Sequence, residues 1–295
     1  MGNQPLLELL KEAEKHDVRI IFSGNSPQFS SVSRGEMFKV FSDRYGHVFL
    51  QDVQRQRRSI DRDVSKYLAF GKASVAVDAI ARSGGFIWNE DQEDSIFSLV
   101  EKWANDRIDF PYGTCLILAS TNREVKFIND LVHRLRVMQG EISNKEFECD
   151  TIFGRSRISE GDFIEFRENN NDLKIINGDQ GVLISASKNK FVVAVDDKEV
   201  SFNPEEFTAF QLAYASTNYR SQGRTVDRCY LLYRQKMYKK LTSLYVGMSR
   251  HVRRSYCFVS KDETPTLMHL KARAFPLKRF DNFSKYFNQH TFQIF

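Results

Sequence analysis

Two polar segments in the second half of the chain contain the residue types that bind phosphate. The first, TNYRSQGRTVD, runs from Thr217 to Asp227 between two apolar, strand-like segments. Arg220 adds a positive charge, and Gly223 lets a backbone approach closely. Short hydroxyls suit phosphate oxygens, and contacts of this kind hold a nucleic-acid backbone without reading its sequence. The hydroxyls belong to Thr217, Ser221 and Thr225. A polar surface loop without a ligand is the alternative.

The second segment, YVGMSRH, ends a helix-like stretch and carries Arg250 just before a predicted strand. A guanidinium in this position can act as an arginine finger, which stabilises the charge that develops on a transferring phosphate. The alternative is an ordinary surface salt bridge.

A third polar loop follows the apolar stretch that ends at Gly24 and carries Asn25, Ser26 and Gln28. A glutamine amide there could sense a phosphate, although a plain βα turn has the same composition. The sequence has no G-x-x-x-x-G-K-[ST] phosphate loop, and FGKAS lacks its first glycine and its final hydroxyl. The acidic pair in FVVAVDDK resembles a magnesium site, but a hairpin turn at Asp196-Asp197 explains it better.

Strands alternate with helices over the first half of the chain, which predicts parallel βαβ units and an α/β fold. Apolar residues at helical spacing predict helices at 6–17, 35–46, 94–107 and 122–142, and a pair over 58–86 that breaks at Gly71. Short apolar runs predict strands at 18–24, 47–53 and 114–120. After about residue 153, short strands and polar turns predict a small antiparallel barrel inserted in the α/β unit.

The α/β pattern returns after the predicted barrel. We expect strands at 209–216, 228–233 and 255–260 and a helix at 239–250, while the tail from Pro265 shows no clear period. The chain has 295 residues, 41% of them hydrophobic and 27% charged, which is typical of a globular protein. No apolar run is long enough to cross a bilayer and no signal sequence is evident, so the expected location is the cytoplasm.

The net charge of +5 permits a polyanionic partner without requiring one. Three compact basic groups, QRQRR (54–58), GRSR (154–157) and SRHVRR (249–254), add weight to that reading, although each could be a solvated surface. The four cysteines are scattered, which predicts free thiols rather than disulfides or a zinc site.

The two phosphate-binding segments resemble signatures of superfamily 1 DNA helicases, T-x-H-K-S-Q-G-x-T and Y-V-A-M-[ST]-R, in the same order and at similar spacing. GNSPQF resembles the G-D-x-x-Q-L motif, QRQ the R-Q motif, and LILASTNREVKFIN a third helicase segment. The chain is most similar to the helicase portion of TraA/TraI-type conjugative relaxases, in the RecD-like branch. The resemblance runs from about Leu6 to Ser260.

The resemblance implies a RecA-like motor fold with an inserted SH3-like β-barrel, and ATP and Mg²⁺ as cofactors. It divides the chain into the end of a first RecA-like domain (1–50), a second domain (51–152 and 208–262), the barrel (153–207) and a tail (263–295). Arg55 and Arg250 would approach the γ-phosphate, and Gln28 would couple the nucleotide to DNA. Gly24, Gln222 and Gly223 would lie at the nucleotide. Single-stranded DNA would contact Thr121, Asn122, Thr217, Tyr219, Arg220, Ser221 and Thr225.

Three departures from the helicase pattern are present. Asn25 replaces an Asp, Tyr219 and Arg220 replace His and Lys, and the sequence begins after the point where the family has its phosphate loop and magnesium-binding Asp-Glu. We therefore expect part of a 5′ to 3′ helicase that does not hydrolyse ATP alone, and a partner chain could supply the missing motor domain. The alternatives are a non-catalytic module that binds single-stranded DNA or docks on a partner, and a decayed gene fragment.

Overall fold

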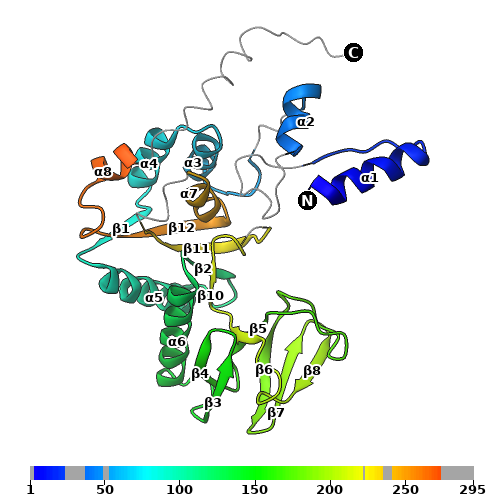
Figure 1. Cartoon of the computed structure of the whole chain (residues 1–295). Helices are drawn as coiled ribbons and strands as arrows, with labels where there is room; N and C mark the ends of the chain where they lie inside the picture. Colours follow the sequence, from blue (N-terminus) through cyan, green and yellow to red (C-terminus); the bar gives the residue numbers. More distant parts are fainter. Residues whose placement is uncertain (1–2, 24–36, 49–52, 222, 235–240, 274–295) are drawn as a thin grey trace.

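The computed structural model describes residues 3–23, 37–48, 53–221, 223–234 and 241–273 (Figure 1). Its larger unit is a five-stranded sheet with the strand order β1-β12-β11-β2-β10, in which all neighbours are parallel. The strands are β1 (Phe86–Asn89), β2 (Cys115–Ala119), β10 (Ala215–Thr217), β11 (Val226–Leu232) and β12 (His251–Ser260).

Helices cover both faces of this sheet, above and below it in Figure 1. One face is covered by α3 (Ser59–Ala69), α4 (Ala73–Arg82), α7 (Leu241–Met248) and the short α8 (Leu267–Arg273). The opposite face is covered by α5 (Gln92–Asp109) and α6 (Asn122–Met138). The predicted α/β fold, a parallel sheet flanked by helices, is confirmed.

The central strand β2 shows why an unbroken apolar run forms this sheet. Leu116 and Leu118 pack into the core beneath α3 and α4, whereas Ile117 and Ala119 pack toward α5 and α6. Side chains alternate between the faces of a strand, so a strand buried on both faces needs apolar residues at every position.

The first part of the chain contains α1 (Asn3–Lys15) and α2 (Met37–Tyr45), as the sequence predicts. The predicted strand at 18–24 is wrong over residues 18–23, which have no regular structure, and Ile21 is 93% exposed. A strand needs a neighbour to satisfy its backbone groups, and no described strand lies beside this segment. The predicted strand at 47–53 falls mostly outside the described residues.

The helix pair predicted over 58–86 is confirmed as α3 and α4, and it breaks at Gly71. This glycine has a φ of +73°, a backbone conformation that side chains with a Cβ disfavour. The last residue of the predicted segment, Phe86, begins β1 instead of ending a helix, because it pairs in parallel with Cys257 of β12.

Between α6 and β10 the chain forms an antiparallel unit. The β3–β4 hairpin stands beside a five-stranded sheet with the order β8-β7-β6-β5-β9. Its strands are β3 (Glu146–Thr151), β4 (Gly154–Ser159), β5 (Phe163–Phe166), β6 (Gln180–Ser187), β7 (Lys190–Val195), β8 (Lys198–Phe202) and β9 (Phe210–Leu212). We call residues 146–212 the insert. Its SH3-like character and the proposed domain limits stay predictions.

The insert is built around a cluster of phenylalanines. Phe202 contacts Phe210 with ring centroids 5.1 Å apart and Phe166 with centroids 5.6 Å apart. The predicted hairpin at Asp196-Asp197 is confirmed, because Val195 and Lys198 pair across a two-residue turn. In the part of the chain that the structure describes, no group of three or more His, Cys, Asp or Glu side chains could hold a metal ion.

The strand predicted at 209–216 is in fact two strands in different sheets. β9 pairs with β5 in the insert, and β10 pairs with β2 in the parallel sheet. Asn129 of α6 bonds to both sides of the break, donating to Leu212 O at 2.7 Å and accepting from Ala215 N at 2.7 Å. The change of sheet therefore depends on a distant side chain.

All four cysteines are free, as predicted; Cys115 is partly buried and the other three are buried. Among the described helices, none combines the length and the apolar composition that a membrane span requires.

Candidate functional site

The segment 217–226, which we call the motif loop, joins the two edges of the parallel sheet. At its start, Asn218 N donates to Ala119 O, the last residue of β2, at 3.3 Å. At its end, Val226 N donates to Arg250 O at 3.1 Å, where β12 is about to begin. The loop thus runs from the carboxyl edge of the sheet to its amino edge, so one segment contacts both edges.

Arg250 lies at the amino edge, in the turn between α7 and β12. Its side chain is 1% exposed, and its Nε and Nη2 have no hydrogen-bond partner among the described residues. Burial, followed by the nearby charge of Arg55, lowers the pKa of Arg250. The surface salt bridge considered from the sequence is therefore wrong for the described part of the chain, which gives Arg250 no acidic partner.

The predicted R-Q motif reaches the same place. Arg55 Nη1 donates to Ser249 O at 2.7 Å, and Gln56 Nε2 donates to the same oxygen at 3.0 Å. Arg57 N also donates to Val252 O at 2.9 Å. The basic groups QRQRR and SRHVRR, about 190 residues apart, therefore lie side by side and bring two guanidinium groups together.

This arrangement fits an anion. A buried charge is stable when it is paired, and the two nitrogens of Arg250 that lack a described partner could donate to a nucleotide phosphate after a rearrangement that exposes them. His251 and Asp61 lie next to this site, with 3.4 Å between His251 Nε2 and Asp61 Oδ2. Mg²⁺ does not fit the described residues in the same way, since they offer no cluster of acidic ligands.

Thr121 and Asn122 lie at the opposite, carboxyl edge, where β2 leads into α6. The Thr121 hydroxyl accepts from Glu124 N at 3.2 Å, and the Glu124 carboxylate accepts from Thr121 N at 3.0 Å. This capping box fixes the start of α6. Asn122 is exposed, and the buried hydroxyl of Ser120 has no hydrogen-bond partner among the described residues.

The motif loop continues this edge through Thr217, which is half-buried, and Tyr219, which is 45% exposed. Gly223 and Thr225 are exposed in the last part of the loop, which leads to the amino edge of the sheet, and the φ of Gly223 is +87°. Ser221 is fully buried and donates its hydroxyl to Asn218 O at 2.7 Å. In this conformation the Ser221 hydroxyl therefore serves the loop itself.

Arg220 points to the insert, where its Nη1 donates to Glu165 Oε1 at 2.7 Å. Arg234 is a second basic residue with acidic partners, at the carboxyl end of β11. It donates to Glu124 and to Glu263, the latter at 2.9 Å. Neither Glu165 nor Arg234 stands out in the sequence, because their partners are far away along the chain.

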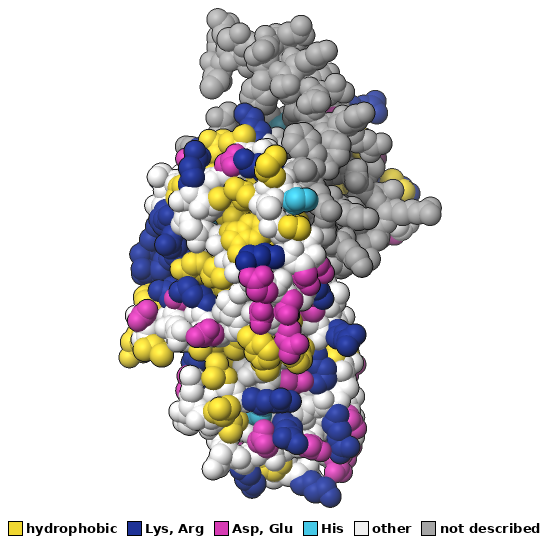
Figure 2. Space-filling view, turned by 90° about the vertical axis from the view of Figure 1, so that its left-hand side faces the viewer, with side chains coloured by type: hydrophobic (Ala, Val, Ile, Leu, Met, Phe, Trp, Pro, Cys, Tyr) yellow, Lys and Arg dark blue, Asp and Glu magenta, His cyan; other side chains and the backbone are white. Residues whose placement is uncertain are grey.

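Three of the predicted site residues, Gly24, Gln28 and Gln222, lie outside the described residues. The third basic group, GRSR, lies on β4 next to acidic residues of β3. Arg157 contacts Glu148 at 3.3 Å, and Arg155 contacts the same residue at 3.7 Å. Figure 2 shows basic and acidic side chains interspersed over the lower part of the molecule. This group is charge-balanced, in agreement with the solvated-surface alternative.

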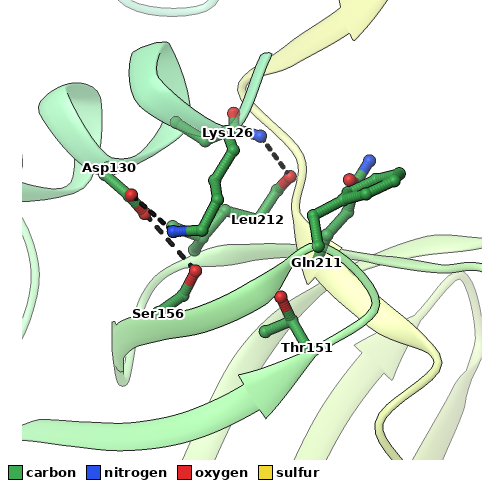
Figure 3. A pocket seen from close by; sticks show the side chains of 8 residues that line it. Lys126, Asp130, Thr151, Ser156, Gln211 and Leu212 are labelled. Atoms are coloured by element: carbon green, nitrogen blue, oxygen red, sulfur yellow. Dashed lines mark hydrogen bonds and ion pairs between the residues drawn. The ribbon is translucent and has the colours of Figure 1, made fainter. Parts of the chain in front are cut away.

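The joint between α6 and the insert encloses a small polar cavity of about 10 Å³, enough for about one water (Figure 3). Lys126 pairs with Asp130 at 2.7 Å on one side, and Ser156 of β4 donates to Asp130 at 3.4 Å. The cavity is too small for a nucleotide or a base, so it is part of the joint and not a ligand site.

Comparison with known proteins finds relatives in sequence and in structure. Residues 1–91 match a family model described as an AAA domain. Over 255 residues the chain is 29% identical to a probable conjugal transfer protein TraA of Sinorhizobium fredii, and 28% identical to a conjugal transfer protein TraA of Rhizobium radiobacter. The chain is a relative of part of these conjugal transfer TraA proteins. Each match covers 85% of this chain, which spans only 23% of the length of those TraA proteins.

The fold of this TraA relative is that of a Pif1 helicase. It superposes on Bacteroides Pif1 in complex with ADP-AlF3 and single-stranded DNA with a TM-score of 0.53 and 16% identity. That match covers 92% of this chain and 67% of the other. Pif1 of Candida albicans gives a TM-score of 0.53 at 14% identity, covering 81% of this chain and 60% of the other. The predicted RecA-like motor fold is therefore confirmed.

Proposed function

We propose that this chain is part of a 5′ to 3′ ATP-dependent DNA helicase or translocase of conjugative DNA transfer. It contributes single-stranded DNA binding and arginine fingers, and the phosphate loop comes from elsewhere in the same assembly. The proposed division is the end of a first motor lobe (1–50), a second lobe (51–152 and 208–262), an SH3-like barrel (153–207) and a tail (263–295).

The observation that carries this proposal is the buried guanidinium of Arg250, which lies beside Arg55 and has two nitrogens without a hydrogen-bond partner among the described residues. A buried cation held beside a second, partly buried one is costly unless an anion joins them. In this proposal the γ-phosphate of ATP is that anion, and Arg250 and Arg55 stabilise the charge that develops on it. The nucleotide supplies the chemistry, and Gly24, Gln222 and Gly223 line its site.

For DNA, the proposal assigns the carboxyl edge. Tyr219 offers an exposed ring on which a base can stack, and Asn122 and Thr217 offer donors for phosphates. By the family resemblance the proposed set also includes Thr121, Arg220, Ser221 and Thr225, although in this conformation Ser221 is buried and Thr225 lies near the amino edge. Gln28 would link the nucleotide to DNA. Two Bacteroides Pif1 structures that share this fold contain single-stranded DNA, which supports the assignment.

Fluorescence anisotropy with a labelled oligothymidine tests the DNA part. We expect binding that weakens steeply between 50 and 200 mM salt, because phosphate contacts release counterions. Absent or salt-insensitive binding would contradict it. ATP hydrolysis by the purified chain, with and without the oligonucleotide, tests whether the chain needs a phosphate loop supplied from elsewhere in the assembly. We expect none, whereas DNA-stimulated hydrolysis that Arg250→Ala abolishes would show that the chain is a complete motor.

The second candidate is a non-catalytic module that binds single-stranded DNA or docks on a partner. It is favoured by the absence of a G-x-x-x-x-G-K-[ST] motif from the sequence and of a metal-binding cluster from the described residues. The two candidate functions differ in the role that they give to Arg250. Only the helicase part should restore DNA-stimulated ATP hydrolysis when it is mixed with a chain that carries the missing motor elements, and that hydrolysis should need Arg250.

A further inference from the structure

Glu165 is a carboxylate of β5 that lies almost completely inside the protein, with 2% of the residue exposed. It accepts hydrogen bonds from two arginines of the motif loop, Arg220 at 2.7 Å and Arg224 at 3.4 Å. Because a buried carboxylate is stable only with such partners, this contact joins the insert to the motif loop.

Neighbouring strands of the insert hold this carboxylate in place. Glu165 pairs in register with Gln180 on β6 and with Gln211 on β9. Both glutamine amides point at it, and Gln180 Nε2 donates to Glu165 Oε2 at 2.7 Å. The position of the carboxylate is therefore set by the sheet, and Arg220 and Arg224 of the motif loop donate to it there.

The charge balance around Glu165 is uneven. Arg167 of the insert is a third guanidinium, with its Nε 3.8 Å from Glu165 Oε1. Burial, and then the charge of Arg220, lowers the pKa of Arg167 to about 10. Three cations around one carboxylate repel one another, so loss of the carboxylate charge should drive the arginines apart.

We propose that Glu165 is a positioning residue that fixes the path of the motif loop between the DNA edge and the nucleotide edge. By drawing Arg220 and Arg224 to the insert, it leaves Tyr219 and Thr217 at the carboxyl edge and keeps Val226 against Arg250. The effect on the loop is independent of ligands. Only the consequence for DNA binding rests on the proposed function.

Hydrogen–deuterium exchange of the full chain without ligand tests the effect on the loop. Five amides report on it, since each donates to a backbone oxygen: those of Asn218, Arg220, Ser221, Arg224 and Val226. Glu165→Gln keeps the side-chain shape and removes the charge. We expect these amides to exchange roughly tenfold faster or more, as in local opening, while β7 and β8 stay unchanged.

The control is Glu199→Gln, which removes an exposed carboxylate from β8 of the same sheet and should change nothing. In an Arg220→Gln/Arg224→Gln background, Glu165→Gln should no longer accelerate loop exchange, because the loop cations have already been removed. Unchanged loop exchange in Glu165→Gln would overturn the proposal. Faster exchange throughout the insert would also overturn it, since Glu165 would then serve only the insert's own folding.

Anisotropy with oligothymidine, measured on the same variants, separates this proposal from the proposed function. We expect Glu165→Gln to bind several-fold more weakly than Glu199→Gln. Faster loop exchange with unchanged affinity would support the positioning role and count against DNA binding by the motif loop.

Discussion

The Val226 amide donates to the Arg250 carbonyl across 3.1 Å, so the end of the motif loop is bonded to the residue that carries the buried guanidinium. The same loop begins with Asn218 N bonded to Ala119 O at the opposite edge of the sheet. One segment therefore contacts both edges of the sheet. In the proposed function, with DNA at one edge and the nucleotide at the other, this segment would couple the two ligands.

Arg250 has no acidic partner among the described residues, which predicts that its buried charge lowers the stability of the fold. Arg250→Met removes a buried cation and keeps much of its volume, so we expect the free energy of unfolding to rise by about 1–4 kcal/mol. Urea denaturation measures this change. The control is Arg254→Met, a partly buried arginine on β12, which should change stability by less than about 0.5 kcal/mol or lower it. Destabilisation by Arg250→Met would mean that the guanidinium has a partner.

The exposed ring of Tyr219 predicts a stacking contribution to DNA binding. Tyr219→Ala should weaken oligothymidine binding by about 1–3 kcal/mol, and equally at 50 and 200 mM salt because stacking releases few counterions. The matched control is Tyr112→Ala, which removes a 97% exposed ring from the turn before β2, at the amino edge. Equal losses in the two variants would point to a general surface effect instead of a site at the carboxyl edge.

Substitutions of Thr121 and Thr225 should have different effects on stability and on DNA binding. The Thr121 hydroxyl caps α6, so Thr121→Ala should lower the free energy of unfolding by about 1 kcal/mol, and Thr121→Ser should retain the cap. Thr225 is exposed, so Thr225→Ala should leave the melting temperature unchanged and weaken only DNA binding. Thermal melts and anisotropy on the three variants test both statements. A large loss of stability in Thr225→Ala would contradict this division.

The features predictable from the sequence are those with local patterns. The amphipathic period gives α5 and α6, and the apolar run gives β2, because burial acts on residues a few positions apart. The capping box at Thr121 is also local. The four-residue β1 lacks such a pattern, since its stability comes from pairing with β12, about 170 residues later.

In the candidate site, too, only the features with local sequence patterns are predictable. The arginines could be selected from motifs, but their surroundings depend on contacts between distant segments. Arg250 is buried because 54–58 packs beside 249–252, and Arg220 meets Glu165 because the insert folds back onto the loop. The split of 209–216 into β9 and β10 likewise depends on Asn129, 83 residues before Leu212. Spacing along the chain carries no information about these contacts.

His133 predicts a pH-dependent stability at the joint between α6 and the insert. Its ring is buried between two carboxylates, with Nδ1 2.8 Å from Asp162 and Nε2 3.0 Å from Glu146. Burial alone would lower the pKa of His133, but the hydrogen bonds and charges of Asp162 and Glu146 outweigh it and raise the pKa. The protonated ring therefore stabilises the folded state fully below the ordinary pKa of about 6.5, and this contribution is lost as the pH rises through the raised value.

The measurable consequence is a difference in the free energy of unfolding between the parent chain and His133→Gln that becomes smaller as the pH rises. At pH 6, His133→Gln should be clearly less stable than the parent chain, because the neutral amide leaves the buried carboxylate of Asp162 and the more exposed one of Glu146 without their cation. Above the raised pKa the parent ring is neutral too, so the difference in free energy of unfolding should narrow. His269→Gln, an exposed histidine of α8, should track the parent at every pH. A difference for His133→Gln that stays constant from pH 6 to pH 9 would show that the ring does not change its charge in this range.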